Sequence, residues 1–61
     1  MKIIITDYVK DNKGEYVEIN NSYKDIEKIE FNHREAKITF VNGNSFDVYL
    51  GTYKKVKVEG K

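Results

Sequence analysis

Apolar and polar residues alternate in two short segments that flank Gly43, and this pattern predicts a β-hairpin. Every second residue is apolar in residues 36–40 and again in residues 46–50, as in strands with one buried face. An Asn-Gly pair between two such segments is a strong turn signal. Only a loop of three or five residues keeps both apolar sets on one face, because a shift of one residue turns a strand over. We expect three cross-strand pairs: Phe40 with Phe46, Ile38 with Val48, and Ala36 with Leu50.

The N-terminal segment predicts a second hairpin. Residues 2–10 alternate in the same way, and residues 11–14 have the composition of a type I turn that ends in a left-handed glycine. A three-residue loop pairs Val9 with Val17 and joins their apolar faces.

The closing position of this hairpin leaves two registers open. The three-residue loop places Asp11 opposite Glu15, and like charges directly opposite one another are destabilising. A four-residue loop pairs Lys10 with Glu15 instead. We favour the three-residue loop because it keeps the apolar residues of both strands on one side.

Alternation stops between residues 20 and 25 and returns in two further segments. At most one helical turn is expected near residues 22–27, where a serine precedes an aspartate by three positions. Residues 28–32 and 55–58 are predicted as strands. The strand at residues 28–32 can join the central hairpin with its apolar face on the same side. This arrangement pairs Phe31 with Ala36 and Ile29 with Ile38.

These elements describe one all-β domain, residues 1–61, built as an antiparallel meander of five to six short strands. We expect a small barrel or strongly curved meander, SH3-like or related, because curling covers the apolar face in so short a chain. The alternative is an open curved sheet that forms a homodimer. The predicted core consists of Ile3, Ile5, Val9, Val17, Ile19, Ile29, Phe31, Ala36, Ile38, Phe40, Phe46, Val48, Leu50, Val56 and Val58.

Composition limits what can stabilise this domain. The chain has no Cys and a single His, so it can form neither a disulfide nor a zinc site of Cys and His ligands, and no cofactor is expected. No segment approaches the about 20 apolar residues of a membrane span. The apolar run at residues 3–5 is too short for a signal peptide. We expect a cytoplasmic protein that does not enter the membrane.

Residue usage indicates the kind of genome that encodes the chain. Lys, Ile, Asn, Tyr, Phe and Met account for 32 of the 61 residues, whereas Gly, Ala, Arg and Pro account for six. The first group has A/T-rich codons and the second has G/C-rich codons. We infer a low-G+C bacterium, or a phage or mobile element that resides in one.

Residues able to carry catalysis are few and scattered. His33 falls in a predicted turn, and we interpret it as an exposed turn residue rather than a general base. Asp25, Glu27 and Glu30 are interpreted as a solvated acidic edge. Asp7 lies on the apolar side of its strand, where a rim position or a bulge is a simpler explanation than a buried functional acid. We predict that the protein is not an enzyme and has no catalytic or metal site.

Nucleic-acid binding is one function class to weigh, because small barrels stack bases on aromatic side chains in a basic groove. Ten acidic residues against eleven basic ones leave the chain near neutral. No RRM or cold-shock signature is present. This function is kept as the alternative, and the residues it would use are Lys10, Lys37, Lys54, Lys55 and Lys57.

Protein binding is the favoured function class. Five tyrosines are many for this length, and tyrosine is enriched at protein interfaces. A short sheet also leaves edge strands that can pair with a partner; the lysines of residues 54–57 protect one edge, and residues 3–5 are a less protected one. We predict a small inhibitor or adaptor with an unidentified protein partner; a subunit of a larger assembly, such as a virion, is a further alternative. The candidate contact residues are Tyr8, Tyr16, Tyr49 and Tyr53.

Overall fold

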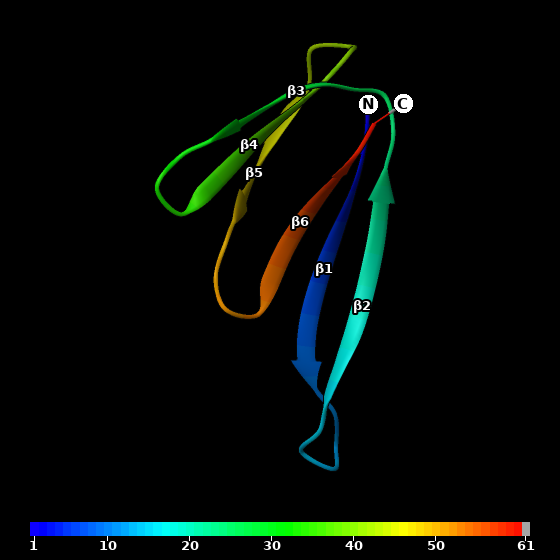
Figure 1. The fold of residues 1–61 in the computed structure, drawn as a ribbon, viewed down its shortest axis with the longest axis vertical. Helices are drawn as coiled ribbons and strands as arrows, with labels where there is room; N and C mark the ends of the chain where they lie inside the picture. Colours follow the sequence, from blue (N-terminus) through cyan, green and yellow to red (C-terminus); the bar gives the residue numbers. More distant parts are fainter. Residues whose placement is uncertain (61) are drawn as a thin grey trace.

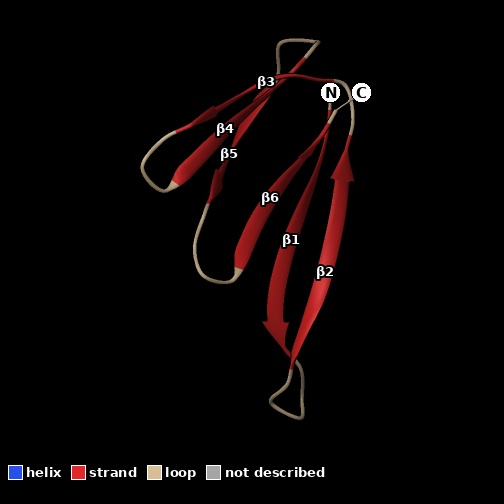
Figure 2. Cartoon of the chain, in the orientation of Figure 1, coloured by secondary structure: helices blue, strands red, loops and turns tan. Residues whose placement is uncertain are grey.

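The computed structural model describes residues 1–60, and these residues form two antiparallel three-stranded sheets (Figure 1). The first sheet has the strand order β2-β1-β6 and the second has the order β3-β4-β5. Figure 2 shows strands joined by loops, with no helix in the described part. The predicted all-β, antiparallel class is therefore confirmed. The strands are β1 (Lys2–Lys10), β2 (Tyr16–Tyr23), β3 (Ile26–Phe31), β4 (Glu35–Phe40), β5 (Ser45–Tyr49) and β6 (Lys54–Glu59).

The β1–β2 hairpin has the register that the three-residue loop predicts. Val9 pairs with Val17, and the backbone N–H of Asp11 donates to the carbonyl of Glu15 at 2.8 Å. The Asp11 carboxylate also accepts hydrogen bonds from the N–H groups of Lys13 and Glu15, both at 2.9 Å. Gly14 has a φ of 81°, in the left-handed region. This side-chain turn offsets the like-charge pairing of Asp11 with Glu15.

The β4–β5 hairpin keeps its apolar residues on one face but is shifted from the expected pairing. Ile38 lies opposite Phe46 and Ala36 opposite Val48, so the three expected pairs are wrong by two residues. The loop has three residues and closes where the Phe40 N–H donates to the Asn44 carbonyl at 2.8 Å. The shorter loop adds ladder pairs, and Phe40 still stacks on Phe46 as a diagonal neighbour, with ring centroids 5.7 Å apart.

The segment expected to contain a helical turn is extended instead. β2 continues to Tyr23, and β3 begins at Ile26. Asp25, which has a φ of 61°, turns the chain between them, a conformation that Asp tolerates better than most residues. Ile26 N–H donates to the Met1 carbonyl at 3.0 Å. The turn thereby carries the chain from the first sheet into the second and buries Ile26 at 2% exposure.

Strand order differs from a simple meander because β1 lies between β2 and β6. Lys2 is paired with Glu59 across β1 and β6, so the first and last strands lie side by side (Figure 1). The two sheets do not close into a barrel: among residues 1–60 no ladder joins β2 to β3, and β5 and β6 are connected by a turn with the single bridge Gly51–Lys54. The expected pairings of Ile29 with Ile38 and of Phe31 with Ala36 are present.

The core lies between the two sheets and is smaller than predicted. Its buried members are Ile3, Ile5, Ile26, Ala36, Ile38 and Val48. Half-buried residues pack around them: Tyr23, Ile29, Phe40, Phe46, Leu50 and Val56. Ile26 and Tyr23 are additions that alternation did not indicate, because they flank the break in the pattern.

Five residues predicted for the core are exposed by 40–60%: Val9, Val17, Ile19, Phe31 and Val58. The molecule is elongated, 41 Å along its longest axis against 24 and 18 Å along the others. The far half of the β1–β2 hairpin extends past the second sheet (Figure 1), so Val9, Val17 and Ile19 are not covered by that sheet.

Candidate binding surface

Three of the five tyrosines and two lysines gather on the outer face of the first sheet. Because side chains alternate along β1, Ile3 and Ile5 face the core while Tyr8 and Lys10 face away from it. We call the resulting surface the tyrosine–lysine patch; it consists of Tyr8, Lys10, Tyr16, Tyr53 and Lys55.

The β1–β2 turn places Tyr16 in this patch. The three-residue loop pairs Tyr16 with Lys10, and the Lys10 ammonium lies 5.6 Å from the Tyr16 ring centroid. A four-residue loop would shift the register by one and turn Tyr16 toward the opposite face. The hydrogen bonds of the Asp11 carboxylate, which hold the turn, therefore also determine where Tyr16 lies.

Tyr53 reaches the patch from the other side of β1. The Tyr8 N–H donates to the Tyr53 carbonyl at 2.9 Å, which extends the β1–β6 ladder by one position beyond Lys54. The Tyr53 ring stacks on Tyr16 across the central strand, with centroids 5.1 Å apart and planes inclined by 11°. Lys55 lies with its ammonium 5.6 Å from the Tyr8 ring centroid.

The patch is exposed yet internally ordered. Tyr16 and Tyr53 keep 51% and 54% of their surface accessible, although their rings stack. An aromatic pair contributes about 0.5–1.5 kcal/mol beyond area burial, and an exposed cation–π contact about 0.5–1 kcal/mol. A shallow recess of about 350 Å³ lies over the patch, and it is lined by Tyr8, Tyr16, Thr52, Tyr53 and Lys55.

Contact with Tyr53 changes the titration of Tyr16. Hydrogen bonding to the Tyr53 side chain, then desolvation, then the Tyr53 charge raise the pKa of Tyr16 above 10.0. The neutral phenol is therefore favoured in the folded protein. Its contribution to stability is present below pH 10 and is lost as the pH rises through the raised pKa of Tyr16.

Tyr53→Phe should lower the pKa of Tyr16 back toward 10.0, because it removes the hydroxyl that favours the neutral phenol. Titration of tyrosinate absorbance measures this: the part of the curve due to Tyr16 should move to lower pH. Tyr49→Phe is the matched control, since it removes a tyrosine of the second sheet and should leave that part in place. If the titration curve of Tyr53→Phe still shows Tyr16 ionising at the same high pH as in the wild type, the prediction is contradicted.

The four other residues predicted for binding lie outside the patch. Tyr49 is on β5, 62% exposed, and pairs with Glu35 in the second sheet. Lys37 is on β4 between Glu30 and Asp47. Lys54 faces the inner side of the first sheet, where it forms an ion pair with Asp7 at 3.3 Å. Lys57 lies on the outer face with the patch but farther along β6, opposite Ile4.

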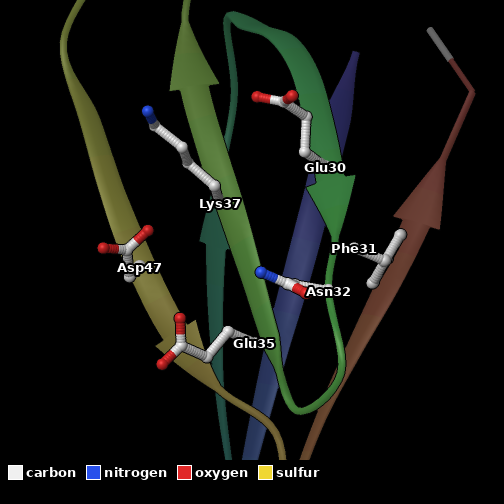
Figure 3. A pocket seen from close by; sticks show the side chains of 6 residues that line it. All are labelled: Glu30, Phe31, Asn32, Glu35, Lys37 and Asp47. Atoms are coloured by element: carbon white, nitrogen blue, oxygen red, sulfur yellow. The ribbon is translucent and has the colours of Figure 1, made fainter.

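A second recess, of about 330 Å³, lies on the outer face of the second sheet (Figure 3). Its charged side chains are Glu30, Glu35, Lys37 and Asp47, so it is acidic where the tyrosine–lysine patch is basic. Phe31 points away from these side chains in Figure 3, as strand alternation requires. Among residues 1–60, no group of three or more His, Cys, Asp or Glu residues is arranged to hold a metal ion.

Two of the titratable residues singled out in the sequence, His33 and Asp7, have ordinary surroundings. His33 is exposed in the β3–β4 turn, where its N–H donates to the Asn32 side-chain oxygen at 2.8 Å. Asp7 is half-buried at a regular position of β1, without a bulge, and its carboxylate is neutralised by Lys54. A surface ion pair of this kind contributes about 0–1 kcal/mol to stability.

Comparison with known proteins identifies no relative. No family model matches the chain, and no significant match is found among curated proteins or solved structures. No helix in residues 1–60 is long and apolar enough to cross a membrane.

Proposed function

We propose that this protein is a small, non-enzymatic protein-binding module and that the tyrosine–lysine patch is its contact surface. The observation that carries the proposal is the exposed Tyr16–Tyr53 stack, set between Lys10 and Lys55 on the outer face of the first sheet. We propose an inhibitor or adaptor of a low-G+C bacterium, or of a phage or mobile element in one, on the basis of composition.

Ordered tyrosines are suited to binding because they provide contact area with little further loss of freedom. Immobilising a side chain at an interface costs about 0.5–1.5 kcal/mol. Here the Tyr16 and Tyr53 rings already restrain one another, and the backbone hydrogen bond from Tyr8 N–H to the Tyr53 carbonyl holds Tyr53 against β1. Interface residues that contribute most to affinity are enriched in Tyr, and they cluster as these do.

Charge indicates the chemistry of the partner. Lys10, Lys55 and Lys57 lie on the outer face of the first sheet, where Glu18 is the nearby counter-charge along β2. Lys2 and Glu59 at the end of this face pair with one another at 3.8 Å. We propose a partner whose contact surface combines carboxylates with groups that accept hydrogen bonds from tyrosine hydroxyls.

The arrangement favours a protein over a nucleic acid. Base stacking needs open ring faces. Tyr16 is already stacked on Tyr53 and has the Lys10 ammonium over its ring, while Lys55 lies over Tyr8. The five lysines that a nucleic-acid surface would use also do not share one face, because Lys37 lies on the second sheet and Lys54 is paired with Asp7.

Affinity capture from a low-G+C bacterial lysate, with and without nuclease, tests the proposal. Wild-type protein should retain a nuclease-resistant partner near stoichiometric yield. The double variant Tyr8→Ala/Tyr53→Ala should lose it, with a drop in affinity of at least about tenfold, since interface tyrosines of this kind contribute 1 kcal/mol or more.

Tyr49→Ala is the matched control, because it removes an exposed tyrosine from the second sheet and should retain the partner. Far-UV circular dichroism establishes that each variant is folded. Undiminished capture by the double variant would contradict the proposed surface. Recovery of nucleic acid, with partners lost after nuclease treatment, would instead support the alternative function through Lys10, Lys55 and Lys57.

A further inference from the structure

β2 is an edge strand without the usual protection against pairing. It has eight residues and, within residues 1–60, is hydrogen-bonded to β1 alone. Seven of its residues are exposed, and its one charged residue is Glu18. Natural edges are protected by lysine, proline, bulges or short length.

The other edge strands have such features: β6 is rich in lysine, β3 has a bulge and several charges, and β5 is short. Residues 3–5, expected to be the less protected edge, lie in the central strand β1 instead.

The free backbone groups of β2 belong to alternate residues. The Asp11 N–H donates to the Glu15 carbonyl, so hydrogen-bonded pairs of this hairpin fall on odd-numbered residues such as Val9 with Val17. The N–H and C=O groups of the even-numbered residues therefore point outward from the edge. These residues are Tyr16, Glu18, Asn20 and Ser22.

We propose that a second copy of this chain pairs with β2 in antiparallel fashion, with the two-fold axis at Ile19. Pairing must match even-numbered residues with even-numbered ones, so the axis passes through a residue, and the four central residues of β2 are Glu18, Ile19, Asn20 and Asn21. An axis at Asn21 sets Ile19 opposite Tyr23. An axis at Glu18 sets two carboxylates opposite one another. An axis at Asn20 sets the apolar side chain of Ile19 opposite the polar side chain of Asn21. Only an axis at Ile19 places this exposed apolar side chain against its own copy.

The proposed register is complementary along its whole length. Ile19 faces Ile19 at a closely spaced position, Glu18 faces Asn20, Val17 faces Asn21, and Tyr16 faces Ser22, so no like charges are opposed. Four exchanged pairs provide about eight main-chain hydrogen bonds. The pairing forms one six-stranded sheet and sets side chains of the second copy beside Val17 and Ile19, which are 42% and 45% exposed in a single chain.

A two-fold dimer of this kind is self-complementary and closes on itself. It places two tyrosine–lysine patches on the same outer face of the joined sheet. The dimer does not depend on the patch being a binding surface. The Tyr8→Ala/Tyr53→Ala variant should therefore dimerise as the wild type does, which separates this proposal from the function proposed above.

Disulfide cross-linking tests the register directly, because the chain has no cysteine of its own. In the proposed dimer the two Ile19 Cα atoms are about 4.5 Å apart, within the range of about 4.4–6.8 Å that a disulfide spans. Mild oxidation should convert Ile19→Cys to a covalent dimer in high yield. Val9→Cys, on the same face but one strand inward, should stay uncrosslinked.

Light scattering with size-exclusion chromatography should show a dimer for the wild type and a monomer for Ile19→Lys. Val9→Lys, at a similarly exposed position, is the control and should remain dimeric. A wild-type monomer at submillimolar concentration would overturn the proposal. Equal cross-linking of Cys at positions 9 and 19 would also overturn it, because it would indicate contact between faces rather than edges.

Discussion

Replacing Ile38 by alanine should leave most of the protein unfolded at room temperature. Ile38 is fully buried between the two sheets and lies opposite both Ile29 and Phe46. Truncating a buried isoleucine to alanine costs about 2–5 kcal/mol, and a domain of this size has about 3–5 kcal/mol of net stability. Far-UV circular dichroism and urea denaturation should show loss of the cooperative transition.

Variants that remove fewer atoms, or the same atoms at an exposed position, distinguish a loss of core packing from a general sensitivity of this small domain to substitution. Ile38→Val should stay folded with a loss of about 0.5–1.5 kcal/mol. Val48→Ala and Val9→Ala remove the same atoms from a buried and an exposed position, so only Val48→Ala should lower the unfolding midpoint clearly. A midpoint of Ile38→Ala equal to that of the wild type would show that the two sheets do not depend on this core.

Gly43→Val should destabilise the protein by about 1–3 kcal/mol, the usual cost of holding a side chain in a disfavoured backbone region. Gly43 has a φ of 95° in the three-residue β4–β5 loop, and its N–H donates to the Phe40 carbonyl at 2.9 Å. A β-branched residue is strained there. Thermal unfolding should show a midpoint lowered by at least about 4 °C, since 1 kcal/mol corresponds to about 4–8 °C in domains of 60–100 residues.

Gly51→Val is the matched control for this substitution. Gly51 also lies in a turn, has open space around an added Cβ, and does not have the positive φ of Gly43. Its unfolding midpoint should stay near that of the wild type. A midpoint of Gly43→Val equal to that of Gly51→Val would contradict the view that the left-handed glycine stabilises the central hairpin.

Local chemistry accounts for the parts of the fold that were predictable. Alternation identified the faces of β1, β4, β5 and β6, since a strand with one buried face has a period of two. Turn residues fixed the β1–β2 register, because the Asp11 carboxylate and Gly14 define one loop length. In the β4–β5 hairpin the face was right and the pairing was not, because alternation is unchanged by a shift of two residues.

Other features depend on contacts between segments far apart in the chain. Ile26 is buried because Asp25 turns the chain into the second sheet, where the Ile26 N–H meets the Met1 carbonyl. Val9, Val17 and Ile19 have the pattern of core residues, yet they are exposed since the second sheet does not extend over them. Alternation specifies which face of a strand is apolar but not whether another layer covers it.

Some features of the candidate site could likewise be predicted from the sequence, and others depended on the tertiary structure. Tyr8 and Tyr16 were recognisable from residue type and from their positions on the polar side of the first hairpin, and Tyr53 from its residue type and its place next to a run of lysines. Their meeting required β6 to pair with β1, a contact between the two ends of the chain that no local pattern encodes. For the same reason Tyr49 could not be separated from the other tyrosines, nor Lys54 from Lys55, before the sheets were known.

The sequence by itself determined the all-β antiparallel class, the turn glycines and the apolar side of each strand, because these follow from backbone sterics and side-chain alternation over a few residues. Only the tertiary structure decided which strands are neighbours, how far the core extends, and which side chains form the tyrosine–lysine patch. Those outcomes depend on the packing of two sheets, in which burial at one position is set by residues tens of positions away.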